Sequence, residues 1–121
     1  MKEDRRKHED YLRDMIHAAE KAESFIEGMD FDSFQQDEKT AWAVLKALEI
    51  IGEAAKNIPP RVRKSYPEIP WREMAGMRDK VSHDYFGVSL LRVFETVKED
   101  LPTLRPALVR VLQDIEEGKY A

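Results

Sequence analysis

The sequence has no cysteine, only five glycines and no long apolar run. Without cysteine, the chain forms no disulfide bond, no thiolate nucleophile and no cysteine-ligated zinc site, and it fits a reducing compartment. Its first residues carry mixed charge, and no window approaches the roughly 20 apolar residues that a membrane span requires. We therefore expect a cytoplasmic protein that contacts no membrane.

Length and charge narrow the possibilities further. A chain of 121 residues is long enough for one hydrophobic core and too short for two, so we expect a single domain over residues 1–121. The net charge of −4 disfavours a dedicated nucleic-acid coat. Between Lys56 and Lys80, however, seven basic residues stand against three acidic ones. This segment is either a surface for an anion or a solvated connector.

Apolar residues recur every three or four positions through most of the chain, whereas the alternation typical of strands is absent. The spacing predicts a helix over about residues 5–27, a connection over 29–36, and a second helix that ends near Asn57. A third helix is expected from Trp71, and a fourth over about residues 90–115. Asp32 or Asp37 is available as the N-cap of the second helix.

Glycine and proline mark the expected helix ends. Gly28 stops the first helix, and the Pro59-Pro60 pair ends the second because the residue before proline avoids the α region. Pro102 and Pro106 interrupt the last pattern but leave its phase unchanged, which favours one kinked helix. The sequence predicts an all-α fold, an up-and-down bundle of four main helices whose last helix is kinked at proline.

Trp42 is unusual because it falls with Lys46 on the face of its helix that points away from the predicted core. A large aromatic residue on a polar face suggests burial against another chain, and pairing of two copies is the leading interpretation. The alternative is a contact with the connector that carries Tyr66 and Trp71.

Other titratable residues receive ordinary interpretations. Glu49 and Glu53 lie one helical turn apart, and a solvated charged face explains them better than catalysis does. His8 and His17 have no second ligand at metal spacing, so we expect them at the surface or at its boundary, and we expect no metal site.

Residues 78–85 carry the one pattern that points to a chemistry. Arg78 and His83 lie five positions apart, and Tyr85 follows two residues later. A guanidinium holds a phosphate bidentately and an imidazole moves a proton near neutral pH, and phosphodiester cleavage needs both. Asp79, one turn before His83, is able to accept from its ring and favour the protonated form, which suits a general acid.

The helical geometry of this pair sets a further condition. Five positions separate two side chains by roughly 140° around a helix, so one straight helix cannot aim Arg78 and His83 at the same phosphate. Either the helix breaks before His83, or two copies dock with twofold symmetry and share a cleft.

From about residue 40 to residue 105 the chain resembles the HepT-like branch of the HEPN domains. The resemblance implies a HEPN-like helical domain that dimerises, places two copies of an Arg-x4-His-x-Tyr motif in a cleft between subunits, and cuts RNA with no metal and no cofactor. Four landmarks carry it in the family's order and spacing: Ile51-Gly52-Glu53-Ala54-Ala55, Ile69-Pro70-Trp71, Gly76-Met77-Arg78 and His83-Asp84-Tyr85-Phe86.

The resemblance also implies roles for single residues. Arg78 would bind and polarise the scissile phosphate, His83 would act as acid or base, and Tyr85 would accept adenylyl groups. Asp79 and Ser82 would support the site, although relatives often have Asn at the position of Asp79, and a carboxylate beside the phosphate weakens RNA binding. The RNA-binding candidates are the basic residues around the motif: Arg61, Arg63, Lys64, Arg72 and Lys80.

Three functions follow as hypotheses. The first is a metal-independent endoribonuclease toxin that acts as a homodimer on RNA and is silenced by a cognate minimal nucleotidyltransferase antitoxin, which adenylylates the motif tyrosine. The second is a non-catalytic module that docks the nucleotidyltransferase. The third is a structural helical dimer with no chemistry. The first predicts cleavage in EDTA, and the second predicts binding without cleavage.

Overall fold

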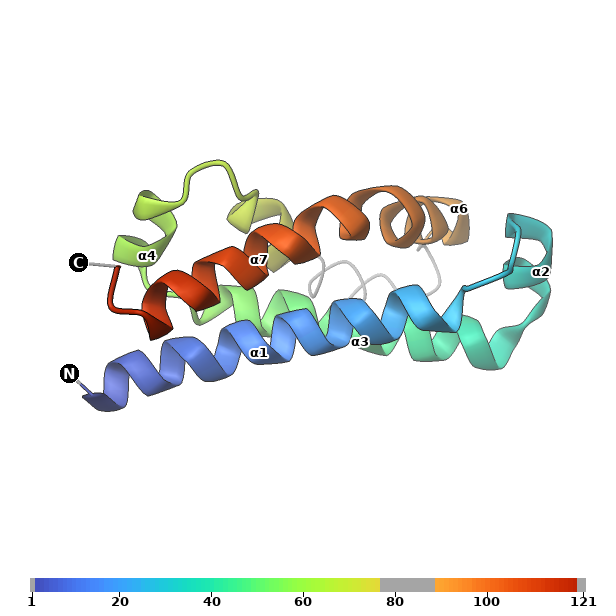
Figure 1. Cartoon of the computed structure of the whole chain (residues 1–121). Coiled ribbons are helices and arrows are strands. Elements are labelled where there is room, and N and C mark those ends of the chain that lie inside the picture. The colour runs from blue at the N-terminus through green and yellow to red at the C-terminus, as the bar shows by residue number, and fades with distance from the viewer. Residues whose placement is uncertain (1, 77–88, 120–121) are drawn as a thin grey trace.

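The computed structural model describes residues 2–76 and 89–119, and of residues 2–7 the backbone alone (Figure 1). Over these residues the chain is helical and contains no strand, which confirms the predicted all-α fold. Residues 71–76 are also helical. The remaining elements are α1 (Lys2–Phe25), α2 (Phe31–Gln36), α3 (Glu38–Lys56), α4 (Pro60–Ser65), α6 (Leu90–Glu95), η2 (Thr96–Asp100) and α7 (Leu101–Glu116).

The long helices lie side by side along the molecule (Figure 1). Helices α1 and α3 are antiparallel neighbours, and α1 also packs against α7. The short helix α2 lies at one end of the bundle, while α4 and the two chain termini lie at the other. No helix in the described ranges is long and apolar enough to cross a membrane.

One cluster of buried side chains fills the space between these helices. Leu12, Met15, Val44 and Ile51 are fully buried between α1 and α3, because their three- and four-residue spacing places them on one face of each helix. His8 is also buried, with 6 % of its surface exposed, so the expectation of a surface or boundary position was wrong for this residue. His17 is exposed, as expected.

The connection expected over residues 29–36 contains a helix. After α1 the chain turns at Gly28, whose φ of +79° lies in the left-handed region that favours glycine. Asp30 then caps α2 by accepting a hydrogen bond from the backbone N–H of Ser33 at 2.8 Å. Phe34 is fully buried in this short helix, and its ring centroid lies 5.3 Å from that of Phe94. Burial of Phe34 therefore holds α2 on the bundle.

The boundaries of α3 agree with the sequence signals. Asp37 accepts a hydrogen bond from the backbone N–H of Thr40 at 3.0 Å and a second from its hydroxyl at 2.8 Å, and Asn57 is the C-cap. The proline pair ends α3 as expected, but the chain does not continue as an open connector. Pro60 occupies the first position of α4, where its missing N–H costs nothing.

The last predicted helix is continuous from Leu90 to Glu116, formed by α6, η2 and α7. Within η2 the helix widens to π-type winding, and the N–H of Leu101 donates to the carbonyl of Thr96. Pro102 follows at once and has no N–H to donate, so the wide turn lies where regular α-helical bonding would fail. The irregularity therefore lies at the first of the two prolines, and the helix continues through Pro106.

Candidate active site

The motif lies outside the described residues, which stop at Gly76 and resume at Ser89. The site roles expected for six residues therefore stay predictions: Arg78, Asp79, Lys80, Ser82, His83 and Tyr85. The structure does show how the chain is held immediately before and immediately after the motif.

The chain before the motif is fixed by a series of hydrogen bonds. The Trp71 indole Nε1–H donates to the carbonyl of Tyr66 at 3.0 Å, and the Tyr66 hydroxyl donates to Oδ2 of Asp114 on α7 at 3.0 Å. Trp71 and Met74 are buried in the core, whereas Arg72 is exposed. Residues 66–76 are thus attached both to the core and to the end of α7.

The chain after the motif is fixed by a cap and by aromatic packing. The Ser89 hydroxyl oxygen accepts from the backbone N–H of Arg92 at 3.3 Å and begins α6. One turn later Val93 and Phe94 are buried, and the Phe94 ring lies 6.0 Å from that of Phe31. Because a functional constellation needs rigid support, two fixed points on either side of the motif suit a site that must orient reacting groups.

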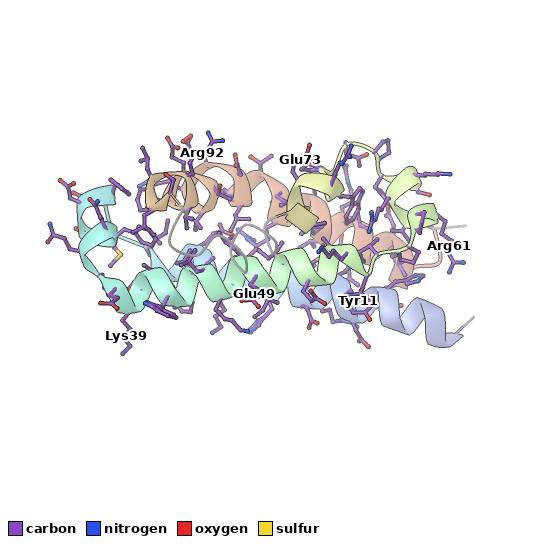
Figure 2. All side chains as sticks on the ribbon, turned by 180° about the vertical axis from the view of Figure 1, so that it is seen from behind. Tyr11, Lys39, Glu49, Arg61, Glu73 and Arg92 are labelled. Atoms are coloured by element: carbon purple, nitrogen blue, oxygen red, sulfur yellow. The ribbon has the colours of Figure 1, made fainter. Side chains whose placement is uncertain are left out.

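The basic candidates fall into two groups. Arg61 and Lys64 on α4, together with Arg72, are exposed, and Figure 2 shows Arg61 projecting from the α4 end of the molecule. Arg61 and Lys64 give the α4 end of the molecule exposed positive charge, whereas Arg72 belongs to the segment 71–76, in which the neighbouring Glu73 lies nearer the middle of the molecule (Figure 2).

Arg63 has a different role in the structure. Its Nε–H donates to the carbonyl of Ile58 at 2.9 Å, and its Nη2 donates to the carbonyls of Ala55 at 3.1 Å and Lys56 at 3.2 Å. The Ala55 and Lys56 carbonyls lie in the last turn of α3, where carbonyls lack the usual helical partner four residues on, and the Ile58 carbonyl lies just beyond the C-cap Asn57. The Arg63 guanidinium is therefore a helix cap that joins α4 to α3, and no sequence signal separated it from its basic neighbours.

The remaining residues singled out in the sequence lie on the outer side of α3. Trp42 keeps 55 % of its surface exposed, as its position opposite the core predicts. Glu53 is exposed and Glu49 is partly exposed. Within residues 2–76 and 89–119, no group of three or more His, Cys, Asp and Glu side chains is placed to hold a metal ion.

Comparison with known proteins identifies the class of protein. The chain belongs to the Ribonuclease HepT-like family, whose model matches residues 15–111. A protein of Thermococcus cleftensis named "Probable ribonuclease HepT" is 54 % identical over 101 residues, which cover 84 % of this chain and 92 % of that protein. "Putative RNase MJ0125" of Methanocaldococcus jannaschii is 40 % identical over 107 residues, which cover 88 % of this chain and 92 % of that protein. No solved structure matches the chain significantly.

Proposed function

We propose that the protein is a metal-independent endoribonuclease that cuts RNA with the Arg78 and His83 motif. Membership of the Ribonuclease HepT-like family carries this proposal, together with two relatives that are named as ribonucleases. The motif supplies the two groups that the reaction needs, a permanent cation for the phosphate and a group that titrates near neutral pH.

The proposed reaction uses RNA's own nucleophile. The ribose 2′-hydroxyl gives its proton to a solvent water as its oxygen attacks the adjacent phosphorus, the bond from phosphorus to the 5′-oxygen breaks, and a 2′,3′-cyclic phosphate remains. Arg78 binds the non-bridging oxygens, on which negative charge accumulates in the transition state. His83, protonated, donates its proton to the departing 5′-oxygen. The products are a cyclic phosphate end and a free 5′-hydroxyl.

The active form is a homodimer. Arg78 and His83 diverge by roughly 140° on one straight helix, so two motif copies in a shared cleft bring an arginine and a histidine to one phosphate. The fixed chain on both sides of the motif, at Trp71 and at Ser89, supports this arrangement because each copy would present its motif from a rigid bundle.

Regulation depends on Tyr85 and on a second protein. A cognate minimal nucleotidyltransferase acts as the antitoxin and transfers adenylyl groups to the Tyr85 hydroxyl. The bond between the α- and β-phosphates of a nucleoside triphosphate breaks, pyrophosphate leaves, and the tyrosine oxygen becomes part of a phosphodiester. The added negative charge and bulk then exclude RNA from the cleft.

The test is cleavage of RNA by the purified protein in EDTA, with analysis of the product ends. We expect 2′,3′-cyclic phosphate ends, and a loss of activity of at least 100-fold in His83→Ala and in Arg78→Ala, since acid catalysis alone contributes on the order of 10²–10⁴. Arg110→Ala, at an exposed arginine on α7, is the matched control and should cut normally. RNA left intact by the parent, or cut equally by His83→Ala, would refute the nuclease.

The second candidate is a non-catalytic module that docks the nucleotidyltransferase. One feature of the sequence favours it, because residue 79 is Asp where the family pattern often has Asn, and a carboxylate beside the phosphate site would weaken RNA binding. This hypothesis predicts RNA binding without cleavage in both the parent and Asp79→Asn, whereas a nuclease should cut faster once the carboxylate is removed. Mass spectrometry after incubation with the partner tests Tyr85, since Tyr85→Phe should gain no adenylyl mass.

A further inference from the structure

The outer side of the α1 and α3 pair carries a groove of about 680 Å³. Three alanines, Ala18, Ala43 and Ala47, line it between the two helices, and their small side chains leave room for another chain to approach. The groove is completed by longer side chains from both helices: Asp14, His17, Lys21 and Phe25 from α1, and Lys46 and Ile50 from α3.

The two ends of this groove differ in charge, and each carries an exposed apolar side chain. Because α1 and α3 are antiparallel, Asp14 and Ile50 lie at one end, while Lys21 and Phe25 lie at the other. Ile50 is 38 % exposed and Phe25 is 39 % exposed. The groove therefore pairs an acid with an aliphatic residue at one end and a base with an aromatic residue at the other.

The groove charges have no ion-pair partner among the residues that the structure describes. The side chains of Asp14, Lys21 and Lys46 form no salt bridge or hydrogen bond with another described residue, although all three residues are exposed. Elsewhere α1 does pair its charges, for example where Glu23 accepts from Arg105 of α7 at 2.6 Å. The groove therefore has an unpaired acidic side chain at one end and an unpaired basic side chain at the other.

We propose that the occupant of this groove is a second copy of the chain, docked with twofold symmetry. An axis that passes between positions 17 and 18 of α1 and between positions 46 and 47 of α3 exchanges the two ends. Asp14 then meets Lys21 of the second copy, and Ile50 meets Phe25 and Ala43 of that copy. Each of these contacts forms twice, once on either side of the axis.

Lys46 lies closest to this axis, so the rotation brings the Lys46 side chains of the two copies near each other. It faces Ala47 of the second copy, and its flexible chain reaches toward Glu49 of that copy, two positions further along α3. The order of charges along α1 is therefore self-complementary, with Asp14 opposite Lys21 at each end, whereas the two Lys46 side chains lie near each other at the axis. Two acids or two bases at positions 14 and 21 would instead have placed like charges together.

This contact is separate from the motif-sharing dimer of the proposed function, on which it does not depend. The described residues that flank the motif, Met74 and Gly76 before it and Ser89 after it, do not line the groove. Two different twofold contacts on one chain build an assembly of more than two copies. The groove contact alone gives a dimer, and only together with the motif-sharing dimer of the proposed function does it give an oligomer of more than two copies.

Charge reversal tests the groove, with mass measured by sedimentation equilibrium over a range of concentrations. Asp14→Lys alone and Lys21→Asp alone each place like charges together twice, so we expect about ten-fold weaker association, equivalent to about 1.4 kcal/mol. Mixing the two variants in equal amounts should restore assembly, because every charge pair between them is again acid against base. Ile50→Glu should also lower the mass.

The controls are Arg110→Asp and Glu95→Lys, which reverse exposed charges outside the groove and should leave the mass unchanged. Groove variants that assemble like the parent, or single variants that mixing does not restore, would overturn the inference. RNA cleavage in the same samples separates the two proposals. A parent that cuts RNA as a dimer and is insensitive to the groove charges would exclude the groove contact and leave the nuclease proposal standing.

Discussion

At the scale of single residues, Arg63 shows how an arginine can serve the fold within a segment rich in basic residues. Its three hydrogen bonds end on carbonyls of Ala55, Lys56 and Ile58, and its positive charge lies at the negative end of the α3 dipole. Its neighbour Arg61 is exposed and projects outward (Figure 2). The two arginines, two positions apart, therefore have different consequences when removed.

Replacing Arg63 with alanine should destabilise the protein by about 1–3 kcal/mol, because the carbonyls of Lys56 and Ile58 would lose the hydrogen bonds from the guanidinium. Arg61→Ala should change the free energy of unfolding by less than about 0.5 kcal/mol, as exposed substitutions usually do. Urea denaturation of both variants measures the difference. Equal stability of the two variants would show that the Arg63 cap contributes nothing.

Asp37 gives the fold a defined dependence on pH. The two hydrogen bonds from Thr40 lower the pKa of the Asp37 carboxyl below its ordinary value of 3.8. Since the folded state holds the charged form more tightly, the stabilisation is complete above the unfolded pKa and is lost as pH falls through the lower folded value. This stabilisation by Asp37 is therefore lost in the acid range, below about pH 4.

Asp37→Asn keeps an acceptor oxygen and removes the titration. We expect the variant to lose less of its unfolding free energy between about pH 6 and about pH 2 than the parent does. Thermal unfolding across this range is the measurement. Glu95→Gln, on an exposed carboxyl at the end of α6, is the control and should follow the parent curve.

At the scale of elements, the long periodic helices were predictable and the short ones were not. The end of α3 was expected from the Pro59-Pro60 pair, and its N-cap proved to be Asp37, one of the two candidates that the sequence offered. The six-residue helix α2 is too short to show a period, and its stability comes from burial of Phe34, which only the folded packing reveals. Helix α4 was missed because a proline that ends one helix can also begin the next.

The connector between α4 and the motif shows the same limit. The hydrogen bond from Tyr66 to Asp114 joins residues 48 positions apart, so no local sequence pattern predicts it. The motif itself was recognised from spacing and resemblance, and its geometry stays a prediction. The attachment of the preceding chain to α7 is visible only in the folded protein.

Tyr66→Phe should cost about 1 kcal/mol, because the Asp114 carboxylate loses a hydrogen bond in a partly buried place. If the connector positions the motif, cleavage should fall further than this stability loss explains, with a larger effect on kcat than on KM. The measurement is steady-state cleavage at a temperature where the variant is fully folded. Unchanged kcat at full folding would limit this hydrogen bond to a structural role.

At the scale of the whole molecule, the chain is acidic overall but keeps exposed positive charge near α4. The net charge is −4, whereas Arg61 and Lys64 on α4 and Arg72 in the segment that follows it are all exposed. RNA that contacts these three side chains would release counterions from its phosphates, whereas the net negative charge of the chain disfavours non-specific binding. Charge therefore restricts where RNA can approach.

Removing all three basic side chains in Arg61→Ala/Lys64→Ala/Arg72→Ala should weaken RNA binding and flatten its salt dependence. The slope of log K against log salt should fall by about 0.7 for each phosphate that is no longer neutralised, hence by about 2 for the three side chains together. The measurement uses His83→Ala as background so that the RNA stays whole, and Arg110→Ala is the control. An unchanged slope would place the RNA on another face.

The last turn of α7 has a consequence for how the chain can be shortened. Glu116 pairs with Arg13 of α1, Ile115 is buried, and Asp114 receives the Tyr66 hydroxyl. Trimming the chain from Asp114 onward would thus remove contacts of α7 with both α1 and the pre-motif connector. The last turn of α7 therefore helps to hold both segments in place, and a nuclease assay on a C-terminally truncated chain would measure the effect of removing it.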